Sequence, residues 1–262
     1  MKKIVYPLSK RILITGATSG IGKATATLFA KRGYDVIITG RRLEKLESLK
    51  VKLKKKYAAR VKILNFDIRD AELTKKAWST LDSSWKKIDI LVNNAGLAKG
   101  LSPIHKGKKE NWDQMIDTNV KGLLYITRLV SPGMVKSKNG HIINICSTAG
   151  HDVYPNGNVY SATKFAVDAL TKSMRIDLHK YGVRVSQVSP GMVEETEFAK
   201  VRFDGDLEKA NIYSDFTPLS SKDVAETILY VATRKKHINI QEVLMMGTQQ
   251  ANSNYVDRSG RM

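Results

Sequence analysis

Residues 15–22 read Thr15-Gly16-Ala17-Thr18-Ser19-Gly20-Ile21-Gly22, a glycine-rich turn between two segments of different periodicity. The apolar run 12–15 before the turn predicts a strand, and the spacing of apolar residues in 21–32 after it predicts a helix. Glycines at such a turn let the backbone approach a pyrophosphate, whose charge the exposed amides and the helix N-terminus attract. The turn therefore predicts a nucleotide site; the alternative is a turn that only redirects the chain.

The rest of the chain repeats this alternation of strand and helix. Strands are predicted at 12–15, 36–39, 61–66, 88–92, 141–145, 183–188 and 242–246, and helices at 21–32, 43–57, 71–81, 111–130, 159–179 and 222–232. Most strand runs are apolar at successive positions, as expected when helices cover both faces of a sheet. We therefore expect an α/β fold of the Rossmann type, a doubly wound parallel sheet of seven strands with helices on both faces.

The composition fits one domain over residues 1–262, because the chain is long enough for one buried core and shows no compositional break. Cys146 is the only cysteine, so no intramolecular disulfide forms and a reducing, cytoplasmic location is expected. Residues 1–11 lack the apolar region of a signal peptide. No apolar run approaches the roughly 18 residues of a membrane span, so no membrane association is expected.

The formal net charge of +19 raises the possibility of a polyanion partner. The densest lysine run, within residues 50–60, shares its predicted helix with an apolar stripe of Leu46, Leu49 and Leu53, which is typical of a solvated helix face. The chain shows neither a zinc-ligand pattern nor an aromatic RNA-binding strand. We expect no metal site and no specific nucleic-acid partner.

The second predicted strand is followed by Gly40-Arg41-Arg42, where proteins that bind NAD usually place an acid for the adenosine ribose. Two arginines at this point are suited to a 2′-phosphate, which they bind with charge-assisted hydrogen bonds. The pair therefore predicts NADP as cofactor. The alternative is that both are exposed charges at the start of a helix.

Tyr160 and Lys164 are four residues apart and hence share one face of the predicted helix 159–179. This spacing alone is weak evidence, since Tyr6 and Lys10 have it too. The case for a catalytic pair is strengthened by Ser147, which lies just beyond the fifth predicted strand, and by Asn119, which lies in the preceding predicted helix. A phenol is a poor base near neutral pH unless positive charge favours its phenolate, and Lys164 can supply that charge. Ser147 can hydrogen-bond the oxygen on which charge develops.

Taken in order, these motifs, with Asn93-Asn94-Ala95-Gly96 and Pro190-Gly191, resemble the short-chain dehydrogenase/reductase family over about residues 10–246. The resemblance implies an enzyme in which Tyr160 is the general acid/base, Lys164 lowers its pKa and holds the nicotinamide ribose, Ser147 orients the substrate, and Asn119 supports a proton-relay water. It also implies a set of residues that contact the cofactor: Gly16, Thr18, Ser19, Gly20, Ile21, Gly22, Arg41, Arg42, Asp67, Ile68, Asn93, Ala95, Gly96, Tyr160, Lys164, Pro190, Gly191, Val193 and Thr196.

Four further stretches, 41–46, 141–150, 154–160 and 196–203, resemble the NADP-dependent 3-hydroxy acid dehydrogenases of this family. The resemblance implies oxidation of serine, allo-threonine and related short 3-hydroxy acids, and reduction of malonic semialdehyde. Such substrates carry a carboxylate, which requires a cation near the reacting carbon. Residues 192–221 are the expected substrate-binding loop, and Arg202 is the candidate cation, or else a solvated loop arginine. Ser147 and Tyr160 are expected to bind the substrate, and Tyr154 is expected to bind it and help close the pocket.

Two other functions remain open at this point. One is an NADPH-dependent carbonyl or 3-ketoacyl reductase acting on uncharged or carrier-bound ketones. The other is a non-catalytic dinucleotide sensor or polyanion-binding protein, which would explain the charge but not the presence of all four catalytic residues. The helices 111–130 and 159–179 resemble those that form the main interface in the family, so the resemblance implies a homotetramer.

Overall fold

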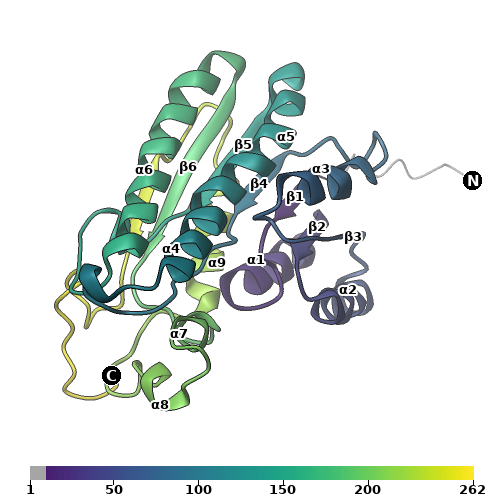
Figure 1. The fold of residues 1–262 in the computed structure, drawn as a ribbon. Coiled ribbons are helices and arrows are strands. Elements are labelled where there is room, and N and C mark those ends of the chain that lie inside the picture. Colours follow the sequence, from purple (N-terminus) through teal and green to yellow (C-terminus); the bar gives the residue numbers. More distant parts are fainter. Residues whose placement is uncertain (1–9) are drawn as a thin grey trace, which may run out of the picture.

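The computed structural model describes residues 10–262. Tyr6 and most of residues 1–11, which are expected to lack a signal peptide, lie outside the described residues. Seven parallel strands form one sheet in the order β3-β2-β1-β4-β5-β6-β7 (Figure 1). They are β1 (Arg11–Ile14), β2 (Asp35–Gly40), β3 (Val61–Asn65), β4 (Ile90–Asn93), β5 (Gly140–Ile145), β6 (Val183–Pro190) and β7 (Glu242–Met245). From β1 the chain adds strands first on one side (β2, β3) and then, from β4 onward, on the other side. Open sheets of this kind bind ligands at that switch point, between β1 and β4.

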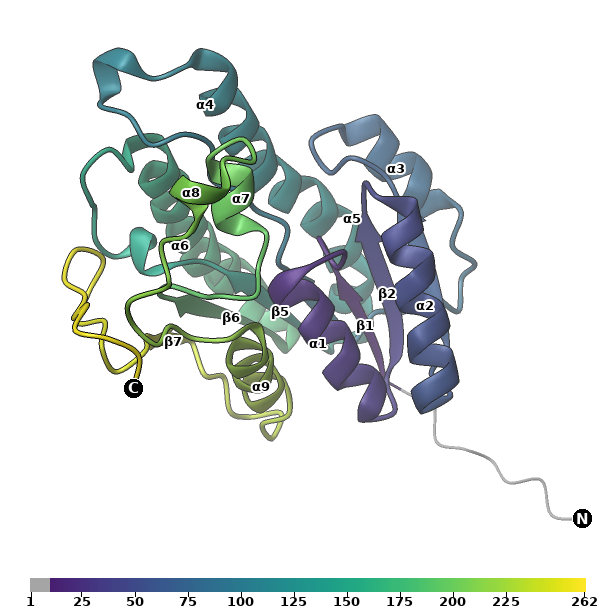
Figure 2. The ribbon, with the colours of Figure 1, turned by 90° about the horizontal axis from the view of Figure 1, so that it is seen from below.

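Helices cover both faces of the sheet (Figure 2). One face carries α1 (Gly20–Lys31), α2 (Leu43–Tyr57) and α9 (Ser221–Ala232), and the other carries α3 (Ala71–Ser79), α4 (Lys109–Ile116), α5 (Gly122–Ser137) and α6 (Asn158–Leu178). All four residues of β1 are buried: Ile12 and Ile14 pack into the core beneath α1, and Leu13 packs into the core beneath α5. The predicted fold class is confirmed.

Local hydrogen bonds define several helix ends. The Asp70 carboxylate accepts from the Leu73 amide at 2.9 Å at the start of α3. Ser220 and Asp223 form a reciprocal capping box at the start of α9. Lys138, which follows α5, takes the left-handed conformation with φ of 50°, so the helix ends directly before β5.

The prediction of one regular helix over residues 111–130 was wrong. The structure has α4, then a π-helical turn at Asp117–Lys121, then α5, which continues through Pro132 to Ser137. A π turn adds a residue to the helical repeat and is frequent at functional sites. It places Asn119 inside the protein, where the Asn119 side chain bonds both backbone groups of Leu97 and the Thr163 hydroxyl.

The expected substrate-binding loop, residues 192–221, holds two short helices. These are α7 (Phe198–Arg202) and α8 (Leu207–Ala210). The Asp206 carboxylate caps α8 by accepting from the Lys209 amide. In Figures 1 and 2 both helices lie beyond the carboxyl ends of the strands, where they cover that end of the sheet.

Candidate functional site

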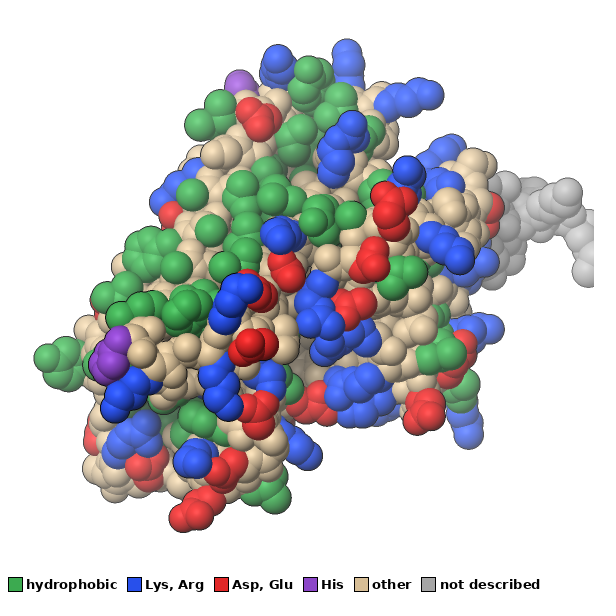
Figure 3. Space-filling view, in the orientation of Figure 1, with side chains coloured by type: hydrophobic (Ala, Val, Ile, Leu, Met, Phe, Trp, Pro, Cys, Tyr) green, Lys and Arg blue, Asp and Glu red, His purple; other side chains and the backbone are tan. Residues whose placement is uncertain are grey.

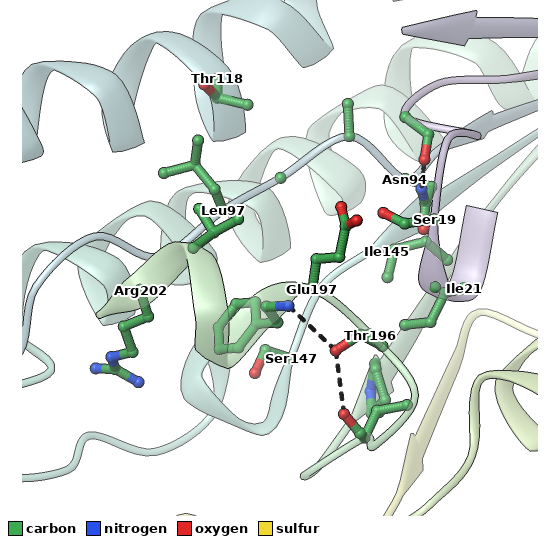
Figure 4. A pocket seen from close by; sticks show the side chains of 18 of the residues that line it. Ser19, Ile21, Asn94, Leu97, Thr118, Ile145, Ser147, Thr196, Glu197 and Arg202 are labelled. Atoms are coloured by element: carbon green, nitrogen blue, oxygen red, sulfur yellow. Dashed lines mark hydrogen bonds between the residues drawn. The ribbon is translucent and has the colours of Figure 1, made fainter. Parts of the chain in front are cut away.

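A cavity of about 410 Å³ opens at the carboxyl ends of the central strands, beneath α7. Such a volume is within the range of small-molecule sites. Figure 4 shows Ser19 and Ile21 at one end of the cavity and Arg202 at the other. Most of the predicted site residues line it: Gly16, Thr18, Ser19, Gly20, Ile21, Arg41, Arg42, Asp67, Ile68, Ala95, Gly96, Ser147, Tyr154, Tyr160, Lys164, Pro190, Gly191, Val193, Thr196 and Arg202.

Three predicted site residues lie outside the cavity lining, namely Gly22, Asn93 and Asn119. A Cβ at Gly22 would lie 2.5 Å from Asn94 Nδ2, so this glycine lets the turn pack against the segment after β4. Asn93 is buried and donates to Thr127 Oγ1 at 2.9 Å and to Asn144 Oδ1 at 2.8 Å. In this structure Gly22 and Asn93 support the residues around the cavity, and their predicted contacts with the cofactor remain predictions.

The glycine turn is held against the segment after β4 by Thr15 and Asn94. Asn94 Nδ2 donates to the Thr15 carbonyl at 2.8 Å, and the Thr15 hydroxyl accepts from the amides of Asn94 and Ala95 at 3.0 and 2.9 Å. Gly16 has φ of 66°, a conformation that favours glycine. The turn consequently has a fixed shape with its backbone facing the cavity.

Tyr160, Lys164 and Ser147 meet where β5 and the first turns of α6 approach each other. Ser147 follows β5, and its hydroxyl hydrogen-bonds the Tyr160 phenol. Lys164 Nζ lies 5.8 Å from the centre of the Tyr160 ring and donates to the Ile145 carbonyl at 3.0 Å. All three side chains line the cavity, so the predicted catalytic group is assembled around one point.

Asn119 lies directly behind this group. A Cβ at Gly96 would be 3.3 Å from Asn119 Oδ1 and 3.6 Å from Lys164 Nζ, so both side chains lie next to Gly96. Asn119 thereby contacts the residues that border the cavity without lining it. Its predicted role in proton relay remains a prediction.

Burial controls the titration of the catalytic group. It raises the pKa of Tyr160 to about 12, against the opposing effects of the Ser147 hydrogen bond and the Arg202 charge. Burial also lowers the pKa of Lys164. Lys164 donates to a backbone carbonyl here, and the roles that the resemblance implied for it, toward the Tyr160 phenol and the nicotinamide ribose, remain predictions. The Tyr160 phenol is thus protonated at neutral pH, the form that donates a proton.

At the opposite end of the cavity Arg42 is held by hydroxyl groups of the glycine turn. Arg42 Nη2 donates to Thr18 Oγ1 at 2.6 Å and to Ser19 Oγ at 3.3 Å. Arg42 Nη1 forms an ion pair with Glu197 at 2.6 Å, and Lys45 binds the same carboxylate. Arg41 is more exposed and lies 3.7 Å from Asp67 Oδ2.

Asp67 is positioned by Arg69, which donates to it from both its backbone amide and its guanidinium. Partial burial acts to raise the pKa of Asp67, but the Arg69 hydrogen bonds outweigh it and the pKa falls below its usual range. Asp67 is therefore a carboxylate at neutral pH. It lies beside Arg41, at the end of the cavity near the arginine pair, and its predicted contact with the cofactor remains a prediction.

Arg202 lies at the Tyr160 end of the cavity and is only 8% exposed. Its Nη2 donates to the Tyr154 hydroxyl at 2.9 Å, its Nε donates to the Gly100 carbonyl at 3.2 Å, and its guanidinium lies 6.0 Å from the centre of the Tyr160 ring. Within residues 10–262 Arg202 forms no ion pair with a carboxylate. The interpretation as a solvated loop arginine was wrong, because α7 turns the side chain inward.

Several cavity residues were not predicted. Asn94 and Glu197 stand within stretches that carried the resemblance, but no local pattern separates them from their neighbours. Gln250, whose Oε1 accepts from the Met192 amide at 2.8 Å, reaches the cavity from the C-terminal segment. Nothing in the sequence around Gln250 indicates that position, because it depends on how the chain returns after β7.

Residues 10–262 contain no group of three or more His, Cys, Asp or Glu side chains arranged to hold a metal ion. Over the same residues, no helix has both the length and the apolar character needed to cross a membrane.

Comparison with known proteins finds close similarity over nearly the whole chain. Residues 10–206 match the family described as "short chain dehydrogenase". The chain is 47% identical over 241 residues to the "NADP-dependent 3-hydroxy acid dehydrogenase YdfG" of Salmonella typhi, covering 92% of this chain and 96% of the relative. It is 44% identical over 245 residues to the "Serine 3-dehydrogenase" of Agrobacterium fabrum, covering 93% and 96%.

A solved structure described as "The Closed form of serine dehydrogenase complexed with NADP+" superposes on this fold with a TM-score of 0.88. It is 45% identical in sequence and covers 93% of this chain and 97% of that one. A second, the "Crystal structure of serine dehydrogenase from Escherichia coli", has a TM-score of 0.79 at 41% identity, covering 92% and 99%.

Proposed function

Because this chain belongs to the short-chain dehydrogenase family, we propose that it is an NADP-dependent oxidoreductase acting on short 3-hydroxy acids. It transfers a hydride between nicotinamide and the 3-hydroxyl or 3-oxo carbon of substrates such as serine, allo-threonine and 3-hydroxypropionate. The relatives at 44–47% identity named above carry this activity in their names. Their similarity extends over more than nine-tenths of the chain.

The observation that carries the substrate class is the buried, unpaired charge of Arg202. A charge out of water is costly unless an opposite charge accompanies it, and in the described residues no carboxylate does so. Its guanidinium is close to Tyr160, the proposed proton donor. A substrate carboxylate would neutralise Arg202 through charge-assisted hydrogen bonds while placing its β-carbon near Tyr160.

The cavity fits the proposed cofactor. The glycine turn presents its backbone at the N-terminus of α1, which suits a pyrophosphate, and Arg42 with the Thr18 and Ser19 hydroxyls suits a 2′-phosphate. Lys164, Pro190, Gly191, Val193 and Thr196 line the portion beside Tyr160 and would hold the nicotinamide ribose and ring. When bound, the cofactor supplies or accepts the hydride.

The residues of this chain supply the rest of the reaction. In reduction, Ser147 and Tyr160 hydrogen-bond the 3-oxo oxygen, and the Tyr160 phenol donates its proton to that oxygen as the carbon accepts the hydride. In oxidation the same phenol must first lose its proton, which the Lys164 ammonium promotes by its charge. Asn119, behind Gly96 and Lys164, supports the path by which the proton returns to solvent.

Tetramer formation and a cytoplasmic location belong to the same proposal. Exposed apolar side chains follow the outer faces of α4, α5 and α6: Ile116, Leu124, Phe165 and Ile176. Figure 3 shows hydrophobic side chains gathered over α5 and α6. A surface of this kind supports packing against a second copy of the chain. Cys146, which is buried and free, suits a reducing compartment.

The test is the initial rate of NADP⁺ reduction with L-serine, allo-threonine, 3-hydroxybutyrate and 3-hydroxypropionate, beside matched uncharged alcohols and with NAD⁺ as paired control. We expect turnover of the hydroxy acids with NADP⁺. In Arg202→Ala, kcat/KM for hydroxy acids should fall by about 10²-fold, the usual cost of a buried charge-assisted contact. Equal rates on uncharged alcohols, unchanged by the substitution, would favour the carbonyl reductase instead.

A further inference from the structure

Glu197 places a carboxylate among the cations at the arginine end of the cavity. Its Oε2 lies 2.6 Å from Arg42 Nη1, and its Oε1 lies 2.6 Å from Lys45 Nζ. Partial burial acts to raise the pKa of Glu197, but hydrogen bonds from Lys45, Arg42 and Ser19 lower it to about 2. Glu197 is therefore fully charged at neutral pH. In Figure 4 it stands in the cavity close to Ser19.

The groups around this carboxylate are those that a phosphate monoester takes. They comprise a guanidinium, an ammonium and the hydroxyl of Ser19, with the Thr18 hydroxyl on the other nitrogen of Arg42. Two anions at one such cluster repel each other, so Glu197 and a phosphate cannot both keep their full set of partners.

Glu197 is also connected to the substrate end of the cavity, because it directly precedes the helix α7. The first residue of α7 is Phe198, whose ring packs edge-on against the Tyr160 ring with 5.5 Å between the ring centres. The last residue of α7 is Arg202. The contact between Lys45 and Glu197 joins positions 152 residues apart. It therefore ties the start of α7 to the start of α2.

We propose that Glu197 is a specificity-determining residue that competes with the 2′-phosphate of the cofactor for Arg42 and Lys45. Binding of NADP exchanges the carboxylate for the phosphate, whereas NAD, which has no 2′-phosphate, leaves Glu197 in place. The start of α7 is thus released from α2 only by the phosphorylated cofactor. This inference rests on the NADP dependence proposed above.

The experiment measures dissociation constants by isothermal titration calorimetry in the wild type, Glu197→Gln and Glu47→Gln. Glu47 is a matched control, because it pairs with Lys50 on the exposed side of α2. The probes are adenosine 2′,5′-bisphosphate against 5′-AMP, and NADP⁺ against NAD⁺. In Glu197→Gln we expect the two 2′-phosphorylated ligands to bind about fivefold more tightly, the effect of losing two partly exposed ion pairs. 5′-AMP and NAD⁺ should be unaffected, and Glu47→Gln should match the wild type.

A second variant, Lys45→Met, tests the other half of the cluster. It should weaken binding of the bisphosphate and leave binding of 5′-AMP unchanged. Weaker binding of the 2′-phosphorylated ligands to Glu197→Gln, or equal changes for both members of each pair, would overturn the competition. A wild type that does not distinguish the bisphosphate from 5′-AMP would instead contradict the proposed NADP dependence, so the two failures are distinguishable.

Discussion

Tyr160 is the residue on which the proposed chemistry depends most directly. Its ring is 7% exposed and packs against Phe198, so removal of the hydroxyl leaves the packing intact. Tyr160→Phe should lower kcat by about 10³-fold, within the usual contribution of a general acid/base, because only the proton carrier is lost. Binding of NADPH, measured by fluorescence titration, should stay within about twofold of the wild type. Retained turnover would contradict the assigned role.

The titration of Tyr160 predicts opposite pH dependences for the two directions. Burial raises its pKa to about 12, so the phenolate needed for oxidation becomes more abundant as pH rises, while the protonated form needed for reduction already prevails at neutral pH. We expect kcat/KM for hydroxy acid oxidation to increase between about pH 6 and pH 9, and that for reduction to stay nearly constant. Initial rates in both directions across this range check the prediction. Oxidation that is independent of pH would show that the deprotonation of Tyr160 does not limit the rate.

Among the secondary-structure elements, the π turn between α4 and α5 shows how a small irregularity positions a side chain. A regular helix through residues 117–121 would keep the 3.6-residue repeat on which the prediction relied. The extra residue of the π turn instead lets the Asn119 amide satisfy both backbone groups of Leu97. Apolar periodicity cannot reveal this turn, because the pattern on either side of it is helical.

The helix α7 has a similar importance for the substrate side. Its short length leaves it little intrinsic stability, so tertiary contacts hold it in place. Arg202 binds the Gly100 carbonyl, and Lys99 forms an ion pair with Asp204 just beyond the helix. The sequence predicts that residues 192–221 lie near the substrate, but these tertiary contacts determine that Arg202 points into the cavity.

For the molecule as a whole, the surface formed by α4, α5 and α6 predicts the state of assembly. Phe165 and Ile176 on α6 are 41% and 72% exposed, an arrangement that water disfavours. The double variant Phe165→Glu, Ile176→Glu should reduce the mass measured by size-exclusion chromatography with light scattering from a tetramer to a smaller species. Val51→Glu, at an exposed apolar position of α2, is the matched control and should leave the mass unchanged. A wild-type monomer would contradict the proposal.

The sequence by itself determined the alternation of seven strands with helices, the glycine turn after β1, the arginine pair after β2 and the group of Ser147, Tyr160 and Lys164. Each is set by local patterns, the hydrophobic period of an element or the residues at its end, and parallel strands bring their carboxyl ends to one edge. Only the tertiary structure decided that Arg202 is buried, that Glu197 binds Arg42 and Lys45, and that Gln250 reaches the cavity. These arrangements depend on pairing between residues that are distant in the chain, as in the contact of Arg202 with Gly100 over 102 positions. No local pattern records such pairing, because its free energy comes from burial and charge neutralisation after the elements have packed.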